Sequence, residues 1–143
     1  MLKIVVSLLI IIFSFQNLFA ADIPIIVIAP SKKVQSISTV GSSVSVYDKS
    51  YIEGTNGFFL GDVLGNGTTS FNYFQTGGHG TNSGIQLRGL PKRYSTVYID
   101  GVKMSDPSSP SNDFYFDHIL KSQISRIEIL KGNQSSVYGN GAI

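Results

Sequence analysis

The chain has 143 residues, with 11 basic and 9 acidic side chains and a formal net charge of +2. A chain of this length suits one small domain, which excludes a two-domain enzyme. Because the two signs of charge are interspersed and Cys is absent, the composition indicates no nucleic-acid surface, no disulfide framework and no thiolate metal site.

The first 20 residues form an apolar leader. Lys3 is followed by a run from 4 to 15 that is almost entirely Ile, Leu, Val and Phe, and small residues follow at Ala20 and Ala21. This order is typical of a signal peptide, here cleaved after Ala20. An uncleaved anchor is the alternative, but the run is shorter than the roughly 20 residues that span a membrane. We therefore expect residues 21–143 to lie outside the cytoplasm.

A short β-prone segment lies between Pro24 and Pro30. It consists of Ile25, Ile26, Val27, Ile28 and Ala29, and we call it the N-terminal segment. Proline cannot donate a hydrogen bond to a ladder, so the flanking prolines favour an edge strand or a segment that pairs with a visiting partner. The alternative is the ordinary first strand of the domain.

The next predicted elements alternate between strand and helix. Residues 43–47 alternate polar with apolar, which predicts a half-buried strand, and Asp48 then offers an N-cap for a helical turn over 49–53. Apolar residues from Phe58 to Leu64 have helical spacing. Residues 68–76 are β-prone.

The second half of the chain predicts short elements joined by turns. Strands are expected at 85–88, 96–99, 102–104 and 124–130, a polar loop at 105–113, an apolar turn at 114–120 and a short segment at 135–138. The dipeptide Asp100-Gly101 predicts a tight hairpin between two of these strands. The whole pattern is mixed α and β.

The residues offer no catalytic or metal-binding group. The chain has two imidazoles, His79 and His118, and no pattern orients either one as a general base. Asp106, Asn112 and Asp113 lack the alternating spacing and the closing Glu of a calcium loop. We expect no enzyme activity, no metal and no cofactor.

Three motifs follow one another in the second half of the chain. They read GIQLRGL at 84–90, VYIDGV at 97–102, and RIEILKG at 126–132 with SVYG at 136–139. Together they resemble the plug domain of TonB-dependent outer-membrane receptors, and the cobalamin and siderophore receptors are the most similar members. The resemblance implies an α+β fold, a small mixed β-sheet with short helices that fills the lumen of a 22-stranded barrel.

The resemblance also implies a domain organisation. Residues 1–20 would be the signal peptide, 21–38 a periplasmic segment with the TonB box, and 39–143 the plug. A barrel of that size needs more than roughly 200 further residues, so we expect this chain to be part of a longer outer-membrane receptor. That receptor would import a scarce nutrient such as cobalamin or an iron siderophore. A free-standing secreted or periplasmic binding module without a barrel is the alternative.

The same family match assigns roles to particular residues. The N-terminal segment, Ile25 to Ala29, would be the TonB box, captured by the TonB C-terminal domain through strand addition. Arg88, Arg126 and Glu128 match charged residues at the contact between plug and barrel wall, where an ion needs a partner. An ordinary solvated strand face is the alternative for these three.

Two segments match the family's substrate-contacting loops. They are Phe71, Asn72, Tyr73, Phe74 and Gln75 in the first, and Asp106, Ser108, Asn112 and Asp113 in the second. Aromatic faces interleaved with amides suit a large, partly apolar ligand such as cobalamin or a ferric siderophore. Core packing is the alternative for the aromatic residues.

Overall fold

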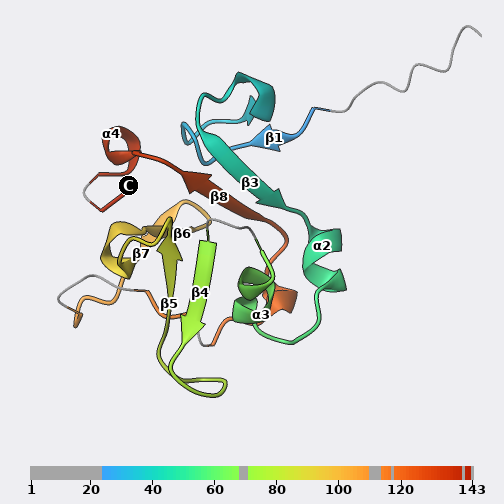
Figure 1. Cartoon of the computed structure of the whole chain (residues 1–143). Coiled ribbons are helices and arrows are strands. Elements are labelled where there is room, and N and C mark those ends of the chain that lie inside the picture. Colours follow the sequence, from blue (N-terminus) through green and yellow to red (C-terminus); the bar gives the residue numbers. More distant parts are fainter. Residues whose placement is uncertain (1–23, 68–70, 110–113, 117, 140, 143) are drawn as a thin grey trace, which may run out of the picture.

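The computed structural model describes residues 24–67, 71–109, 114–116, 118–139 and 141–142 (Figure 1). The predicted signal peptide, Asn112 and Asp113 lie outside these residues. The strands are β1 (Ile26–Val27), β2 (Gln35–Ser36), β3 (Ser43–Tyr47), β4 (Phe71–Gln75), β5 (Ser83–Leu87), β6 (Val97–Ile99), β7 (Val102–Met104) and β8 (Ile127–Lys131). The α-helices are α2 (Lys49–Gly54), α3 (Leu60–Gly65) and α4 (Ser135–Tyr138), and 3-10 turns cover Ile37–Thr39, Lys92–Tyr94 and Lys121–Gln123.

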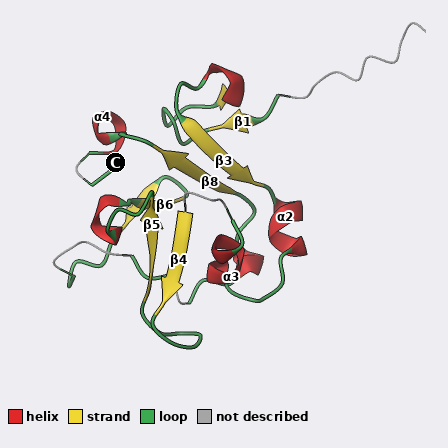
Figure 2. Cartoon of the chain, viewed as in Figure 1, coloured by secondary structure: helices red, strands yellow, loops and turns green. Residues whose placement is uncertain are grey.

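The strands form four two-stranded antiparallel pairs, β1–β2, β3–β8, β4–β5 and β6–β7. The β3–β8 pair joins distant parts of the sequence, with a register that runs from Ser43 opposite Lys131 to Tyr47 opposite Ile127. Figure 2 shows short helices beside these pairs. The expected α+β fold, with small sheets and short helices, is confirmed.

Side-chain carboxylates accept backbone hydrogen bonds at the start of both α2 and α3. The Asp48 carboxylate accepts from the Tyr51 backbone N–H at 2.9 Å, which caps α2 as predicted. The Asp62 carboxylate reaches back and accepts from the backbone N–H groups of Phe58 and Phe59, at 3.0 Å each. Because these two hydrogen bonds hold residues 58 and 59 outside the helix, α3 begins at Leu60, later than its apolar pattern predicts.

In the second half of the chain, a tight turn joins β6 to β7 and a 3-10 turn precedes β8. The β6–β7 hairpin turns at Asp100 (φ 48°) and Gly101 (φ 83°), and this pair of left-handed residues confirms the predicted tight turn. The last strand, β8, begins at Ile127 rather than at residue 124, because Lys121–Gln123 forms a 3-10 turn and the Ile124 N–H bonds back to the Lys121 carbonyl at 3.1 Å.

The core lies where α3, the β4–β5 hairpin and β8 meet. Its buried cluster consists of Leu60, Leu64, Phe116 and Ile129. Ser83 is fully buried beside it and accepts a hydrogen bond from the Phe116 N–H at 3.1 Å, so this buried hydroxyl is satisfied. Among the helices of the described residues, none is long and apolar enough to cross a bilayer.

Candidate functional site: the N-terminal segment and its contacts

The N-terminal segment lies folded against the domain as one arm of a hairpin. Ile26 lies opposite Ser36 and Val27 opposite Gln35, and the Ile37 N–H donates to the Ile25 carbonyl at 2.8 Å. The Val27 side chain is fully buried, whereas Ile25, Ile26 and Ile28 are about half exposed (54%, 49% and 51%). Three isoleucines of one short segment are therefore presented to solvent or to a partner.

Two charged side chains from the start of β8 hold the backbone of this segment. The Glu128 Oε2 atom accepts from the backbone N–H groups of Ile28 (2.9 Å) and Ala29 (2.7 Å). The Arg126 guanidinium donates to the Ile26 carbonyl, and its Nε also donates to Glu128 Oε1 at 2.8 Å. The Glu128 side chain is only 11% exposed, against 39% for Arg126. The carboxylate is therefore enclosed between the guanidinium and two backbone donors.

A tyrosine from α4 completes the contact. The Tyr138 hydroxyl donates to the Ala29 carbonyl, and the Tyr138 ring lies 4.9 Å from the Tyr98 ring. Burial raises the pKa of Tyr138 above its ordinary value of 10.0, and the neighbouring Tyr98 and Glu128 raise it further. The hydroxyl therefore stays protonated and keeps its donor role at any physiological pH. We call Arg126, Glu128 and Tyr138 the clamp.

A basic residue of the following turn packs on the same two rings. The Lys32 ammonium lies 5.0 Å from the centre of the Tyr138 ring and 5.6 Å from that of Tyr98, at cation–π distance. Lys32 also has a positive φ of 56°, which marks the point where the chain turns back from the N-terminal segment toward β2. The clamp thus holds the segment, and Lys32 holds the turn beyond it.

Two of the three clamp residues are predicted site residues. The sequence predicts that Arg126 and Glu128 contact the barrel wall. In the structure they instead contact the backbone of the N-terminal segment, which the sequence predicts as a different site, the TonB box. Tyr138 and Lys32 were not singled out. The hydrogen bonds of the clamp join residues 99 to 109 positions apart, and no local pattern carries that information.

Arg88, the third predicted wall contact, lies elsewhere. It follows the last residue of β5, where its φ of 53° and the φ of 76° at Gly89 turn the chain. The Leu90 N–H closes this turn on the Leu87 carbonyl at 3.0 Å. The turn presents the exposed Arg88 beyond the end of the strand.

The pleat of β4 divides the aromatic substrate candidates between two faces. Phe71 and Tyr73 pack on the core together with their cross-strand partners Leu87 and Ile85. Asn72 is exposed and donates weakly to its partner Gln86 at 3.4 Å. Since successive side chains of a strand alternate, Phe74 shares the face of Asn72, and Gln75 shares that of Phe71 and Tyr73.

In the second substrate candidate, Asp106 and Ser108 form a turn held by their own hydrogen bonds. Asp106 Oδ1 accepts from the backbone N–H (2.8 Å) and hydroxyl (2.6 Å) of Ser108. The Ser108 hydroxyl, and after it the Ser108 N–H, lowers the pKa of Asp106 below its ordinary 3.8. Asp106 is therefore an anion near neutral pH, with Oδ1 already engaged.

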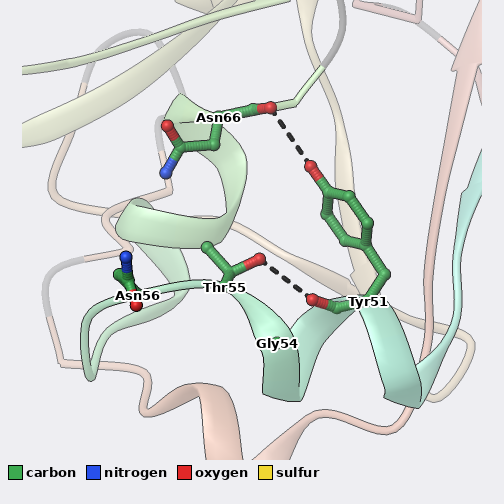
Figure 3. A pocket seen from close by; sticks show the side chains of 5 residues that line it. All are labelled: Tyr51, Gly54, Thr55, Asn56 and Asn66. Atoms are coloured by element: carbon green, nitrogen blue, oxygen red, sulfur yellow. Dashed lines mark hydrogen bonds between the residues drawn. The ribbon is translucent and has the colours of Figure 1, made fainter.

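A shallow polar hollow lies between α2 and the end of α3 (Figure 3). Its volume is about 460 Å³, and it is lined by Tyr51, Gly54, Thr55, Asn56 and Asn66. The Tyr51 hydroxyl donates to the Asn66 carbonyl at 3.1 Å, and the Thr55 hydroxyl donates to the Tyr51 carbonyl at 2.9 Å. None of its lining residues belongs to a predicted site. Within the described ranges, no three His, Cys, Asp or Glu side chains gather as metal ligands.

Comparison with known proteins relates the chain to one family. Residues 36–143 match the model of the TonB-dependent receptor plug domain. The chain is 30% identical over 118 residues to the vitamin B12 transporter BtuB of Vibrio vulnificus. This aligned region covers 82% of the chain and 19% of that protein. It is 29% identical over 131 residues to the vitamin B12 transporter BtuB of Photobacterium profundum, with 90% of the chain and 21% of that protein covered.

The chain thus spans about a fifth of the length of these relatives. The family model covers all strands from β3 to β8 and the three motifs that carry the resemblance. Its name describes a receptor domain and not a class of enzyme. The chain belongs to the TonB-dependent receptor plug domain family.

Proposed function

We propose that this chain is the plug and TonB-docking part of an outer-membrane active transporter that imports a scarce nutrient. The observation that supports it most is the plug-domain match over residues 36–143. In this role residues 1–20 are the signal peptide, 21–38 the periplasmic segment and 39–143 the plug. The plug has no catalytic task and no cofactor. It sits inside a barrel that belongs to the same protein.

Cobalamin is the preferred cargo, ahead of a ferric siderophore. Both relatives described above are named as vitamin B12 transporters. Within this chain, the face of β4 that carries Asn72 and Phe74 combines an exposed amide with an aromatic ring and faces away from the core. Such a surface suits a large ligand with amide side groups on an apolar ring system.

The N-terminal segment is the element that couples the plug to TonB. Its flanking prolines, its β-branched residues and its two-residue strand fit a peptide that adds itself to a partner's sheet edge. TonB would bind the backbone of this segment from the periplasm. Arg88 remains our candidate for a contact with the barrel wall. Arg126 and Glu128 are also candidates for this contact, in a state in which the N-terminal segment no longer occupies them.

Ligand binding by the full-length protein in detergent tests this function. We expect saturable binding of cobalamin, with a ferric hydroxamate and a ferric catecholate siderophore as competitors that fail to displace it. Displacement by one of the siderophores would assign an iron chelate as the cargo instead. Absence of binding for all three would contradict the nutrient class proposed here.

A further inference from the structure

Two Asn-Gly pairs border the polar hollow between α2 and the end of α3. Asn56, which precedes Gly57, and Asn66, which precedes Gly67, both line it (Figure 3). In such a pair the glycine nitrogen can attack the side-chain amide of the asparagine, because no Cβ atom on the glycine hinders the approach. Both asparagines are exposed, so exposure alone does not distinguish their reactivity. A third pair, Asn140-Gly141, includes a residue outside the described ranges.

Hydrogen bonds hold the second pair in an unreactive arrangement. The Gly67 N–H, whose nitrogen would make the attack, donates to the Leu64 carbonyl at 3.1 Å. The Asn66 side-chain amide donates to the Asp62 carbonyl at 2.9 Å, and the Asn66 carbonyl accepts from the Tyr51 hydroxyl at 3.1 Å. Attack on the Asn66 side chain requires the first two of these bonds to break, so the end of α3 must open first.

The first pair lacks such bonds. Within the described part of the chain, neither the Gly57 N–H nor the Asn56 side chain makes a hydrogen bond, and both residues are exposed. The chain on either side is held in place, because the Thr55 hydroxyl donates to the last turn of α2 at 2.9 Å and the Phe58 N–H donates to the Asp62 carboxylate at 3.0 Å. The two reacting groups therefore lie unengaged between two anchored residues.

The fold requires a glycine at position 57. Gly57 has a φ of 105°, a conformation that residues with a side chain rarely adopt. A Cβ atom at this position would also clash with the Asp62 carboxylate. That carboxylate accepts from the backbone N–H groups of Phe58 and Phe59, just before α3 begins. The start of α3 thus excludes a bulkier residue after Asn56, and the reactive pair follows from it.

We propose that Asn56 is a site of spontaneous deamidation in the folded protein and that Asn66 is protected from the same reaction. The Gly57 nitrogen forms a bond to the side-chain carbonyl carbon of Asn56. The bond from that carbon to the amide nitrogen breaks, and ammonia leaves with the proton of the Gly57 N–H. Water then opens the five-membered ring at either of its two carbonyl carbons, which leaves aspartate or isoaspartate at position 56. The reaction needs no enzyme, and the proposal does not rest on the transport function.

The product places a negative charge near a lysine. The Lys121 ammonium donates to the carbonyl of Glu53 at 3.3 Å and to that of Thr55. The Thr55 carbonyl belongs to the peptide bond that leads into Asn56, so the new carboxylate forms in the neighbourhood of this cation and is attracted to it. The isoaspartate product also lengthens the backbone by one methylene group. Deamidation therefore changes both the charge and the length of the loop between α2 and α3.

Peptide mapping by mass spectrometry, after incubation of the full-length protein in detergent, tests the site. We expect Asn56 to deamidate about tenfold faster than Asn66, since two hydrogen bonds must break before the second pair can react. Asn56→Gln should abolish the reaction at position 56, because the longer side chain would have to form a six-membered ring, which closes far more slowly. Asn66→Gln is the matched control and should leave the rate at Asn56 unchanged.

The same protein unfolded in guanidinium chloride separates structure from local sequence. Both pairs then lose their folded surroundings, and their rates should converge. Equal rates at Asn56 and Asn66 in the folded protein would overturn the proposal, and so would a ratio of rates that is the same before and after unfolding. Chromatographic separation of the isomeric peptides tests the route. Aspartate without isoaspartate at position 56 would overturn the ring intermediate, because direct hydrolysis of the amide gives aspartate alone.

Discussion

At the scale of single residues, Gly61 sets how closely α3 approaches β4. A Cβ atom placed on Gly61 would lie 2.5 Å from the ring and hydroxyl atoms of Tyr73, and this ring packs on the core. Gly61→Ala should therefore lower the free energy of unfolding by about 1–3 kcal/mol, the usual cost of overpacking. Chemical denaturation monitored by circular dichroism measures it.

Gly65, in the same helix, provides the control for this substitution. A Cβ at Gly65 would meet no atom within 4 Å. Gly65→Ala should leave stability unchanged or raise it by about 0.5–1 kcal/mol, because the unfolded chain loses conformational freedom. Equal effects of the two substitutions would show that helix propensity, and not contact with Tyr73, determines the result.

The capping residue Asp48 makes stability depend on pH. The Tyr51 N–H, followed by the Ser50 hydroxyl, lowers the pKa of Asp48 below its ordinary 3.8 in the folded chain. A lowered folded pKa means that this contribution is fully present above pH 3.8 and is lost as the pH falls through the folded value. Asp48→Asn should thus have a slightly lower melting temperature than the parent near neutral pH, and the difference should vanish in acid. A difference that stays constant with pH would contradict the charge as its cause.

At the scale of elements, local patterns predicted several of the boundaries. The alternation of residues 43–47, the Asp48 cap and the Asp100-Gly101 turn each depend on neighbours in sequence, and the structure confirms all three. The starts of α3 and β8 were predicted too early because Asp62 and a 3-10 turn compete for the preceding residues. The clamp could not be predicted, since it joins residues about a hundred positions apart.

The β1–β2 hairpin occupies one edge of the N-terminal segment, and we predict that it opens when the segment docks on a partner. Ile26 lies opposite Ser36, and the Ile25–Ile37 bond shows that 26 and 36 form a pair without hydrogen bonds between them. The Cα atoms of such a pair lie about 4.5 Å apart, which suits a disulfide. A variant with Ile26→Cys and Ser36→Cys should therefore close the hairpin covalently.

In oxidised form, this double variant should lose binding to the TonB C-terminal domain, and dithiothreitol should restore it. Isothermal titration before and after reduction measures the change. Ile26→Cys alone is the control for the altered side chain and should bind equally well in both conditions. Undiminished binding by the oxidised hairpin would mean that the partner recognises the segment without separating it from β2.

At the scale of the whole molecule, the two proposed contacts lie on separate parts of the fold. The N-terminal segment is held at the start of β8, whereas the β4 residues proposed to face the ligand lie on the hairpin with β5. Both strands contribute to one buried core, Ile129 from β8 and the packed residues Phe71 and Tyr73 from β4. The packing of this core is therefore shared by the two strands.

Because neighbouring residues of β4 point to opposite faces, one substitution can test ligand binding and the next can test folding. Asn72→Ala should weaken cobalamin binding by the full-length protein about tenfold and leave its stability unchanged, because an exposed amide contributes a hydrogen bond to the ligand and little to the core. Tyr73→Ala should instead cost on the order of 2 kcal/mol of stability, since its half-buried ring packs beside Phe116. Equilibrium binding and thermal unfolding of the same samples measure both effects. If Asn72→Ala binds cobalamin as the parent does, the ligand contacts this plug through residues other than those of β4.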